Sequence, residues 1–377
     1  MRTYIYEVVT GHRTGHLPRL IRWGLAPLSW LYGIGVCFRN WLYDRELFRV
    51  RRLPCPVISV GNLVAGGTGK TPTVIWVAKR LQHSGFRVAV LLRGYRRFRI
   101  SDFGFRKGKA TPLVVSDGEQ TLVSAAVSGD EAAMLASELP GVIVILGKDR
   151  YAAGLAAIKI WGDTHGVLIL DDGFQHRRLA RDLDIVTLDA TQPFGTGYLL
   201  PAGTLREPKS ALRRADVLFL TRTDQAPVLT GLQRFTNRYQ IIVESRHRPT
   251  RLYRLGTSET IPLTYLEGKC VLAVCAIGNP QAFVGTLNQL GAAQVDLVAF
   301  PDHHDYTSKD IARILDRTRR LPDGFIVTTQ KDAQKLALVG NFEALVLAVE
   351  IEPTRHTERL LECLNWTASV QRLDTGS

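Results

Sequence analysis

The residues with the clearest chemistry lie in a glycine-rich segment that ends in a lysine and a threonine. From Val57 to Pro72 the chain reads VISVGNLVAGGTGKTP, so a short apolar run passes into glycines. A loop of this kind between a strand and a helix can direct backbone N–H groups at a phosphate, and its lysine and threonine can reach phosphate oxygens and Mg²⁺. The pattern G-x-x-x-x-G-K-[ST] has Val64 at its first glycine position. We predict that the following residues bind nucleotide phosphates: Gly66, Gly67, Thr68, Gly69, Lys70 and Thr71.

Three further groups of carboxylates and imidazoles could complete a site for phosphoryl transfer. The apolar run VLIL ends in Asp171 and Asp172, a form in which an aspartate engages a nucleotide-bound metal, although turn-forming aspartates give the same pattern. Asp130 either favours the dipole of a following helix or lies at the ligand-binding edge of a sheet. The segment FPDHHD at 300 to 305 could be a metal cluster, an acid and base pair, or a polar loop that caps a helix. The residue types alone leave these alternatives open.

The elements that must position these side chains alternate between strand-length apolar runs and helical patterns. From Cys55 onward the runs VISV, VAVLL, VIVIL and VLIL are separated by helical segments. Runs of Val, Ile and Leu without polar alternation are typical of strands covered on both faces, so we predict an α/β fold with a P-loop NTPase-like parallel sheet. A second alternation begins at Lys269 and predicts a smaller α/β unit.

We predict four parts along the chain. They are an N-terminal membrane-associating helical segment at 1–50, a P-loop kinase domain at 51–245, a connector at 246–268 and a smaller C-terminal α/β domain at 269–377. The connector is assigned because the sequence around 246–254 is arginine-rich and loses its helical period. With the loop and Asp130 in the first unit and FPDHH in the second, we expect the nucleotide between the units and closure to complete the site.

The net charge indicates which classes of molecule the protein binds, and the cysteine pattern indicates whether it holds zinc or disulfides. The chain of 377 residues carries 48 Lys and Arg against 35 Asp and Glu, a net charge of +13, which favours an anionic partner such as nucleic acid, an acidic membrane or a phosphorylated substrate. The basic segment at 96–109 contains three phenylalanines and fits either of the first two. The five cysteines are scattered and form no C-x₂-C pair, so we expect reduced thiols and no zinc site.

The N-terminal region contains an uncharged run, GLAPLSWLYGIGVCF at 24–38, with arginines on both sides. The run is shorter than the ~20 apolar residues that a transmembrane helix needs. Trp23, Trp30 and Trp41, together with the flanking arginines, favour a helix that lies in the membrane interface. The alternative is a helix buried against the core.

Seven segments in order resemble the tetraacyldisaccharide 4′-kinase family. They are VGNLVAGGTGKTP, RGY at 93–95, GDE at 129–131, DDGFQHRRLARDLDI at 171–185, LLPAG followed by LREP at 199–208, FPDHH at 300–304 and TTQKDAQK at 328–335. The resemblance implies ATP- and Mg²⁺-dependent phosphorylation of the 4′-hydroxyl of a tetraacyldisaccharide 1-phosphate, giving lipid IVA in lipid A biosynthesis. It implies an anionic acylated disaccharide lipid as substrate and a membrane surface as partner, at the cytoplasmic face of the inner membrane. Neither nucleic acid nor an obligate protein partner is expected.

Matched motif by motif, the resemblance also implies roles for single residues. Asp130 would be the catalytic carboxylate and His303 its dyad partner. The implied metal ligands are Thr71, Asp171, Asp172 and Glu207. The candidates for contact with substrate or phosphate are Arg93, Tyr95, Gln175, His176 and Arg206. Three positions depart from the family pattern: Arg96 after RGY, where glycine is common, Ala132 after GDE, where proline is common, and Gln330 in TTQKD, where glutamate is usual.

Short sequence patterns also suggest two other classes of protein, a GTPase and a nucleic-acid-dependent ATPase. The segment TQKD at 329–332 loosely matches the guanine-reading pattern [NT]-K-x-D of GTPases, but no D-x-x-G switch motif in the required form follows VLILDD. The basic segment at 96–109 suggests a nucleic-acid-dependent ATPase. Competition between GTP and ATP, and stimulation by DNA or RNA, would distinguish these classes from a lipid kinase.

Overall fold

A computed structural model describes residues 2–11, 13, 15–94, 111–226, 231–257, 259–301, 304–322, 324–340 and 342–370. The basic segment at 96–109 and two predicted site residues, Tyr95 and His303, lie outside the described residues.

The chain forms two compact units. The first comprises Met1–Ser128, Leu135–Arg246 and Pro353–Ser377, and the second comprises Gly129–Met134 and His247–Glu352. This division differs from the predicted domains in three ways: Asp130 groups with the second unit, the last helix returns to the first, and the predicted connector overlaps strand β8 (Ile241–Arg254). The arginines of β8 occupy exposed positions while Val243, Ser245 and Leu252 are buried. An arginine-rich strand of this kind lacks a helical period, which is why it resembled a connector.

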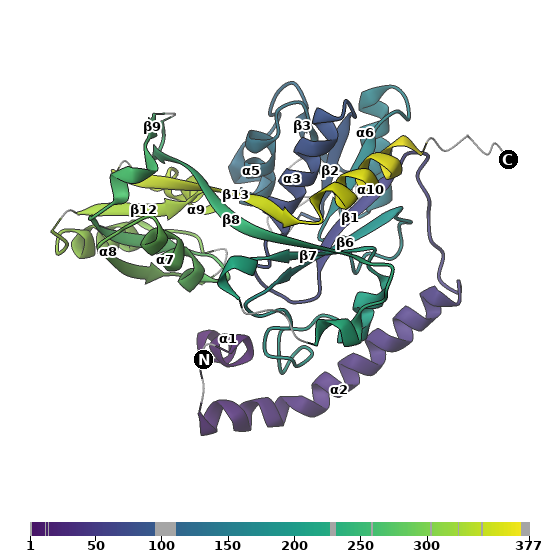
Figure 1. Ribbon diagram of the computed structural model, residues 1–377, viewed down its shortest axis with the longest axis horizontal. Helices are drawn as coiled ribbons and strands as arrows, with labels where there is room; N and C mark the ends of the chain where they lie inside the picture. Colours follow the sequence, from purple (N-terminus) through teal and green to yellow (C-terminus); the bar gives the residue numbers. More distant parts are fainter. Residues whose placement is uncertain are drawn as a thin grey trace. The chain divides into compact units, whose positions relative to one another are not determined.

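The first unit is built on a mostly parallel sheet, as predicted (Figure 1). Its strand order is β8-β7-β6-β1-β5-β2-β4-β3, and the described pairings within this order are parallel except that of β3 with β4. The strands are β1 (Val57–Asn62), β2 (Val88–Leu92), β3 (Leu113–Asp117), β4 (Ile143–Leu146), β5 (Val167–Asp171), β6 (Leu183–Asp189) and β7 (Val217–Thr221). Every residue of β1, β2, β4, β5, β6 and β7 is buried, as expected for strands covered on both faces.

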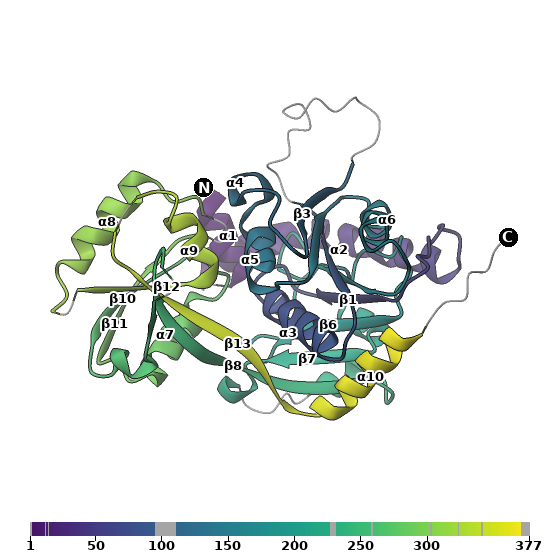
Figure 2. The same cartoon turned by 90° about the horizontal axis from the view of Figure 1, so that it is seen from above.

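Helices cover both faces of this sheet (Figure 2). The helices of this part of the chain are α3 (Lys70–His83), α4 (Ala125–Ser128), α5 (Asp130–Glu138), α6 (Arg150–Trp161) and α10 (Thr357–Ser369), of which residues 130–134 of α5 group with the second unit. Ala153 and Ala157 of α6 pack in one cluster with Val57 of β1 and Leu168 of β5. Because successive strand residues point to opposite faces, Ile58 of β1 belongs to the other face. Helix α3 contacts β1, β2 and β5, and α10 packs against α3.

The second unit contains the smaller α/β sheet that the second alternation predicts. Its order is β11-β10-β12-β13, with parallel pairing between neighbours. Its elements are β9 (Thr260–Ile261), β10 (Cys270–Cys275), β11 (Gln294–Ala299), β12 (Phe325–Thr329), β13 (Leu345–Arg355), α7 (Pro280–Gln289), α8 (Ser308–Thr318) and α9 (Gln330–Leu336). The chain passes from one unit to the other within β8 and again within β13.

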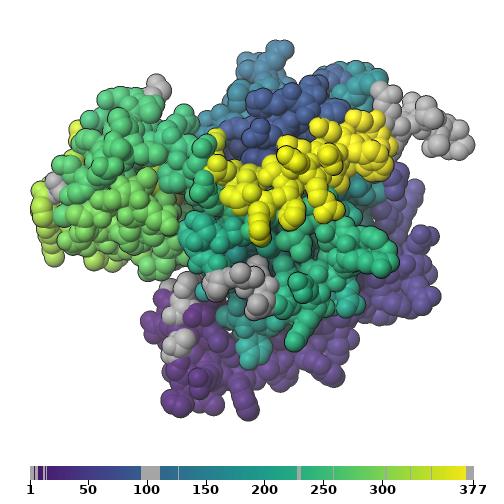
Figure 3. Space-filling view, in the orientation of Figure 1, coloured from purple at the N-terminus to yellow at the C-terminus, as the bar shows by residue number. Residues whose placement is uncertain are grey.

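Two helices precede the first strand, α1 (Arg2–Thr10) and the long α2 (His16–Asp44). One side of α2 is fixed to the first unit: Ser29 Oγ donates to Leu199 O at 3.0 Å, and Tyr32 OH donates to Arg206 O at 2.8 Å. Other positions of α2 expose large apolar side chains. They are Trp23, Trp30, Leu31, Ile34, Phe38 and Trp41. Figure 3 shows the N-terminal part of the chain, which contains α2, in purple at the surface. This exposure disfavours the alternative of a helix buried against the core.

A bilayer-spanning helix is not found in the described part of the chain, where no helix is both long enough and apolar enough to cross a membrane.

Candidate active site

The glycine-rich loop lies between the fully buried strand β1 and helix α3. The backbone at Gly66 (φ 137°) and Gly69 (φ 83°) adopts conformations that residues with a side chain rarely reach. Gly66 and Gly67 are exposed, whereas Thr68 is buried. The loop therefore presents bare backbone to solvent at the N-terminal end of a helix, where an anion is favoured.

Val64, at the first glycine position of the loop pattern, has a packing role. It is buried, forms an antiparallel bridge with Leu205 and packs with Leu205 in the same apolar cluster. The next residue, Ala65, donates its backbone N–H to Thr204 O at 2.7 Å. Val64, which replaces the first glycine of the pattern, thus connects the phosphate loop to the segment LREP at 205–208.

Polar side chains from three neighbouring strands brace the loop. Asn62, at the end of β1, donates Nδ2 to Val64 O at 2.5 Å and to Thr68 Oγ1 at 2.9 Å. Thr68 Oγ1 also lies 2.9 Å from Thr187 Oγ1 of β6, and Thr221 Oγ1 of β7 donates to Thr68 O at 3.2 Å. We did not identify Asn62, Thr187 or Thr221 as site residues from the sequence. Each is a polar residue near the carboxyl end of an apolar run, and this position could have identified them.

Lys70, Asp172 and Arg206 form a charged group at the start of α3. Lys70 Nζ lies 3.7 Å from Asp172 Oδ1, and Arg206 NH1 lies 2.7 and 2.9 Å from the two oxygens of Asp172. Burial raises the pKa of Asp172, but the charges of Lys70 and Arg206 outweigh that effect, so the net pKa is lowered. Asp172 is therefore ionised at neutral pH and balances two cations beside the loop.

Asp171 lies deeper than its neighbour, at the last position of β5, where it is 3% exposed. The parallel register pairs it with Val60 of β1, close to the start of the phosphate loop. Arg150 of α6, which is 2% exposed, donates to Asp171 O at 3.0 Å and to Gly147 O at 2.8 Å. Arg150 thus supports the end of the strand that carries both aspartates, a role that the sequence did not reveal.

Three of the residues predicted to contact the substrate, Gln175, Arg93 and His176, differ in their surroundings. Gln175 belongs to the site, since its Nε2 donates to Asn62 O at 2.9 Å and its Oε1 lies 3.5 Å from Arg206 NH1. Arg93 follows β2 and is exposed. His176 is half-buried, and burial together with the charges of Arg150, Arg181, Arg178 and Arg93 lowers the pKa of its imidazole from 6.5 to about 4. The imidazole of His176 is therefore neutral at pH 7.

This shift predicts how stability depends on pH. The unfolded chain protonates His176 near pH 6.5, whereas the folded chain resists protonation until about pH 4. The unfolded state therefore binds more protons between these values, and the folded state loses stability as the pH falls from 6.5 toward 4. We expect His176→Gln to reduce this loss in denaturant unfolding at pH 7 and pH 5. His165→Gln, at an exposed histidine, should keep the parental dependence, and an equal change in both variants would contradict the assignment.

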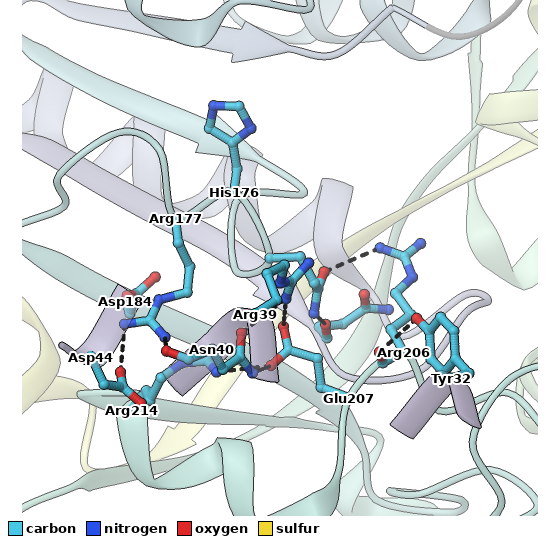
Figure 4. A network of polar contacts seen from close by, with 12 residues as sticks. Tyr32, Arg39, Asn40, Asp44, His176, Arg177, Asp184, Arg206, Glu207 and Arg214 are labelled. Atoms are coloured by element: carbon cyan, nitrogen blue, oxygen red, sulfur yellow. Dashed lines mark hydrogen bonds and ion pairs between the residues drawn. The ribbon is translucent and has the colours of Figure 1, made fainter. Parts of the chain in front are cut away.

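Glu207 lies in a buried network that fixes α2, and its side chain is 0% exposed (Figure 4). Its Oε1 accepts from Arg39 NH2 at 3.1 Å, and its Oε2 accepts from Asn40 Nδ2 and Arg214 NH1, each at 2.8 Å. Figure 4 shows His176 pointing away from this network. Because both carboxylate oxygens already accept hydrogen bonds, the contacts of Glu207 favour a structural role over the predicted metal contact.

Asp130 begins α5, after Gly129 in a left-handed conformation (φ 83°). Within the second unit its Oδ2 lies 2.8 Å from the ammonium nitrogen of Lys335. His303, its predicted partner, lies outside the described residues, so the dyad stays a prediction. Lys335 belongs to the motif TTQKDAQK, but sequence reasoning gave it no role.

His304 is the described histidine of the motif FPDHHD, and its contacts bear on the alternative of a polar loop that caps a helix. His304 stacks on Phe300 with ring centroids 4.7 Å apart, and its Nε2 lies 3.1 Å from Oδ2 of Asp310, which caps α8. The described residues contain no group of three or more His, Cys, Asp and Glu side chains that could hold a metal ion. His304 is thus part of a helix-capping cluster.

The resemblance to a guanine-reading motif has a structural explanation as well. The side chain of Asp332 is buried, and its oxygens accept from Ala276 N at 3.1 Å, Tyr306 OH at 3.1 Å and Thr329 Oγ1 at 2.7 Å. A carboxylate with three protein donors is poorly suited to read a base. Burial raises the pKa of Asp332, which fits a structural group in the interior.

A parallel sheet, a glycine loop that opens a helix, and strand-end aspartates define an α/β nucleotide-binding protein of the P-loop class. A family model described as "Tetraacyldisaccharide-1-P 4'-kinase" matches residues 21–365. The chain belongs to this family and is a kinase by that membership.

Relatives and a solved structure agree with this membership. The "Tetraacyldisaccharide 4'-kinase" of Syntrophus aciditrophicus is 44% identical over 89% of this chain and 91% of its own length. The protein of the same name from Geobacter metallireducens is 41% identical over 92% of this chain and 98% of its own. A crystal structure of LpxK from Aquifex aeolicus, in an "apo" form in complex with ATP, is similar with a TM-score of 0.70 and 34% identity, over 92% of this chain and 99% of that one.

Proposed function

We propose that the chain transfers the γ-phosphate of ATP to the 4′-hydroxyl of a tetraacyldisaccharide 1-phosphate, giving lipid IVA. The observation that carries the proposal is the group of Lys70, Asp172 and Arg206 beside the phosphate loop, in a chain of this kinase family. Phosphoryl transfer depends mainly on positioning and on charge stabilisation. Lys70, at the start of α3, and Arg206 are oriented by the ionised carboxylate of Asp172. The two cations can therefore position a triphosphate and stabilise its charge.

Magnesium fits the oxygen donors at this loop. Mg²⁺ prefers hard oxygen ligands and is usually held by one or two carboxylates together with phosphates and water. We propose Thr71, at the start of α3, and Asp171, at the end of β5, as the protein ligands, because Asp172 is engaged by Arg206 and Lys70. The ion, when bound, would neutralise charge that develops on the phosphates. Asp172 would then act by orienting the two cations.

For the nucleophile, we propose Asp130 as the proton acceptor and His303 as its partner. A sugar hydroxyl is a poor nucleophile, and a carboxylate oriented by a second group can accept its proton as the bond to phosphorus forms. The left-handed Gly129 and the contact with Lys335 support a fixed orientation of Asp130 at the start of α5. The remaining candidates for binding the substrate are Arg93, Tyr95, Gln175, His176 and Arg206.

The reaction can be tested directly by transfer of phosphate from γ-labelled ATP to purified tetraacyldisaccharide 1-phosphate in detergent micelles. We expect label in the lipid product, and we expect ATP but not GTP to compete for the label. Turnover should not respond to DNA or RNA, because we propose no nucleic-acid partner. The purified chain should be active alone, because we propose no obligate protein partner. Absence of labelled lipid, with ATP hydrolysis intact, would contradict the proposed acceptor.

We further propose that the exposed side of α2 docks on the cytoplasmic face of the inner membrane. This side carries three tryptophans and lines an apolar groove of about 540 Å³ together with Leu199 and Pro208. A helix with an exposed apolar side and flanking arginines suits the membrane interface, where tryptophan is favoured and anionic lipids attract basic residues. Hydrogen bonds from Ser29 and Tyr32 to the segment 199–206 would connect the docked helix to the catalytic unit.

The double substitution Trp30→Glu and Leu31→Glu tests the docking. Both side chains are exposed, Trp30 at 73%, so the change should spare the fold while it places two charges in the interface. We expect the variant to move from the membrane to the soluble fraction and to lose lipid turnover far more than any residual ATP hydrolysis. Trp366→Glu on α10, at a tryptophan that is 70% exposed, is the matched control and should stay membrane-bound. Unchanged partition of the double variant would refute docking through α2.

A further inference from the structure

Lys335 is a buried lysine whose position in the second unit demands an explanation. It lies in α9 and is 8% exposed. Lysine is almost never buried without partners, because desolvation of an ammonium group is costly. The function proposed above gives Lys335 no part in ATP binding or in chemistry.

The ammonium group of Lys335 meets two different segments. Its Nζ lies 2.8 Å from Asp130 Oδ2, donates to His304 O at 2.9 Å and lies 3.6 Å from Asp305 Oδ1. The contacts with Asp130 and His304 are within hydrogen-bond distance, whereas Asp305 contributes only a longer charge interaction. One nitrogen therefore ties the first residue of α5 to the loop that immediately follows His303 in sequence.

The helix that carries Lys335 is itself held in place. Thr329 caps α9 by accepting from Asp332 N at 3.2 Å, and the buried carboxylate of Asp332 accepts from Ala276 N and Tyr306 OH. Asp332 lies three residues before Lys335, so the anchor is one turn away along the helix. A lysine on so fixed a helix can orient its partner, which a flexible surface lysine cannot do.

We propose that Lys335 is a positioning residue for Asp130 in the transfer reaction. The inference rests on the proposed function, in which Asp130 accepts the proton of the 4′-hydroxyl. Lys335 holds Oδ2, which leaves Oδ1 as the oxygen that takes the proton. The same nitrogen holds the carbonyl of His304, so it also fixes the backbone next to His303. Lys335 thereby acts through Asp130 and does not itself need to touch ATP or lipid.

This role differs in its consequences from a merely structural ion pair. Removal of one partner from a buried ion pair leaves the other charge uncompensated, so Lys335→Met is expected to lower the melting temperature. Misplacement of a reacting group by about 1 Å can cost roughly 10²-fold in rate. A positioning role therefore predicts a loss in kcat that does not follow stability.

The first test compares Lys335→Met, which keeps the apolar stem, with Lys335→Arg, which keeps the charge. In the micelle assay we expect Lys335→Met to lower kcat by roughly 10- to 100-fold, with KM for ATP within a few-fold of the parent. Lys335→Arg should recover a large part of the loss. Lys309→Met, at an exposed lysine of α8, is the matched control and should keep the parental kcat. Parental kcat in Lys335→Met would overturn the inference, as would a loss that follows the drop in melting temperature across all variants.

The second test separates this inference from the function on which it rests. If Lys335 acts through Asp130, Lys335→Met should change little in an Asp130→Asn background, because the group it orients has already lost its function. A full additional loss in that background would contradict positioning. If Asp130→Asn alone leaves kcat intact, the proposed role of Asp130 fails, whatever Lys335 does. Should Lys335→Met fail to fold, Lys335→Gln replaces it, since its amide can still donate to His304 O, and the same loss and the same masking are expected.

Discussion

Replacement of Asp130 by asparagine is expected to lower kcat by ~10²- to 10⁴-fold, the usual contribution of a general base. Asparagine is nearly isosteric and keeps a hydrogen-bonding group, but it cannot accept the proton of a hydroxyl. KM for ATP should stay within a few-fold of the parent, as expected when an interaction made mainly in the transition state is removed. The measurement is steady-state transfer of labelled phosphate to the lipid, with ATP varied at saturating lipid.

Two companion variants show whether the loss belongs to a dyad. His303→Ala should reproduce much of the loss, and the double variant should be less impaired than the product of the two single effects, because residues that act as a unit are not additive. Glu138→Gln, at the other end of α5, is the control for loss of a carboxylate on the same helix and should keep the parental rate. Multiplicative losses would mean that Asp130 and His303 work independently, and the dyad would have to be abandoned.

Replacement of Lys70 by alanine is expected to damage both nucleotide binding and turnover. Lys70 lies at the start of α3, and its ammonium group is held 3.7 Å from Asp172. Its attraction to the phosphates should increase as charge moves in the transition state, so we expect kcat to fall by about 10²- to 10³-fold, as for the loss of one stabilising donor. KM for ATP should rise as well, which distinguishes Lys70→Ala from Asp130→Asn.

Lys70→Ala also removes one of the cations beside Asp172, while the ion pair with Arg206 remains. Lys70→Arg retains the charge but not the compact ammonium, so it should recover nucleotide binding better than turnover. Lys79→Ala, further along α3, is the matched control and should resemble the parent in both. A variant of Lys70 with an unchanged KM for ATP and an unchanged kcat would remove the phosphate loop from the proposed site.

The sequence by itself determined the features that depend on neighbouring residues. Runs such as VLIL predicted buried parallel strands because a strand covered on both faces needs apolar side chains at every position. The glycines before Lys70 predicted a phosphate loop because few other residues reach the backbone conformations seen at Gly66 and Gly69. The seven motifs predicted the kinase family, which the family model and the relatives confirm.

The arginine-rich stretch that contains Arg246 and Arg248 was predicted to be a connector, and the chain passes from one unit to the other there, within a strand. The strand is β8, where the exposed arginines are flanked by less exposed side chains, and no helical period exists to reveal it. The last helix, α10, packs against α3 although most of the chain separates them. Neighbouring residues carry no information about such a return, because the energy comes from contacts between distant segments.

Only the tertiary structure showed which protein groups each of the candidate carboxylates contacts. In the sequence, Asp171, Asp172 and Glu207 are similar candidates for metal binding. In the fold, arginine and lysine engage Asp172, three donors satisfy Glu207, and Asp171 stays at the buried end of β5 beside the loop. Likewise, the structure places the ammonium of Lys335 against Asp130, about two hundred residues earlier in the chain, which is why we propose a role for Lys335. A side chain's charge is set by its own residue type, but its partners and its burial are set by segments that only folding brings together.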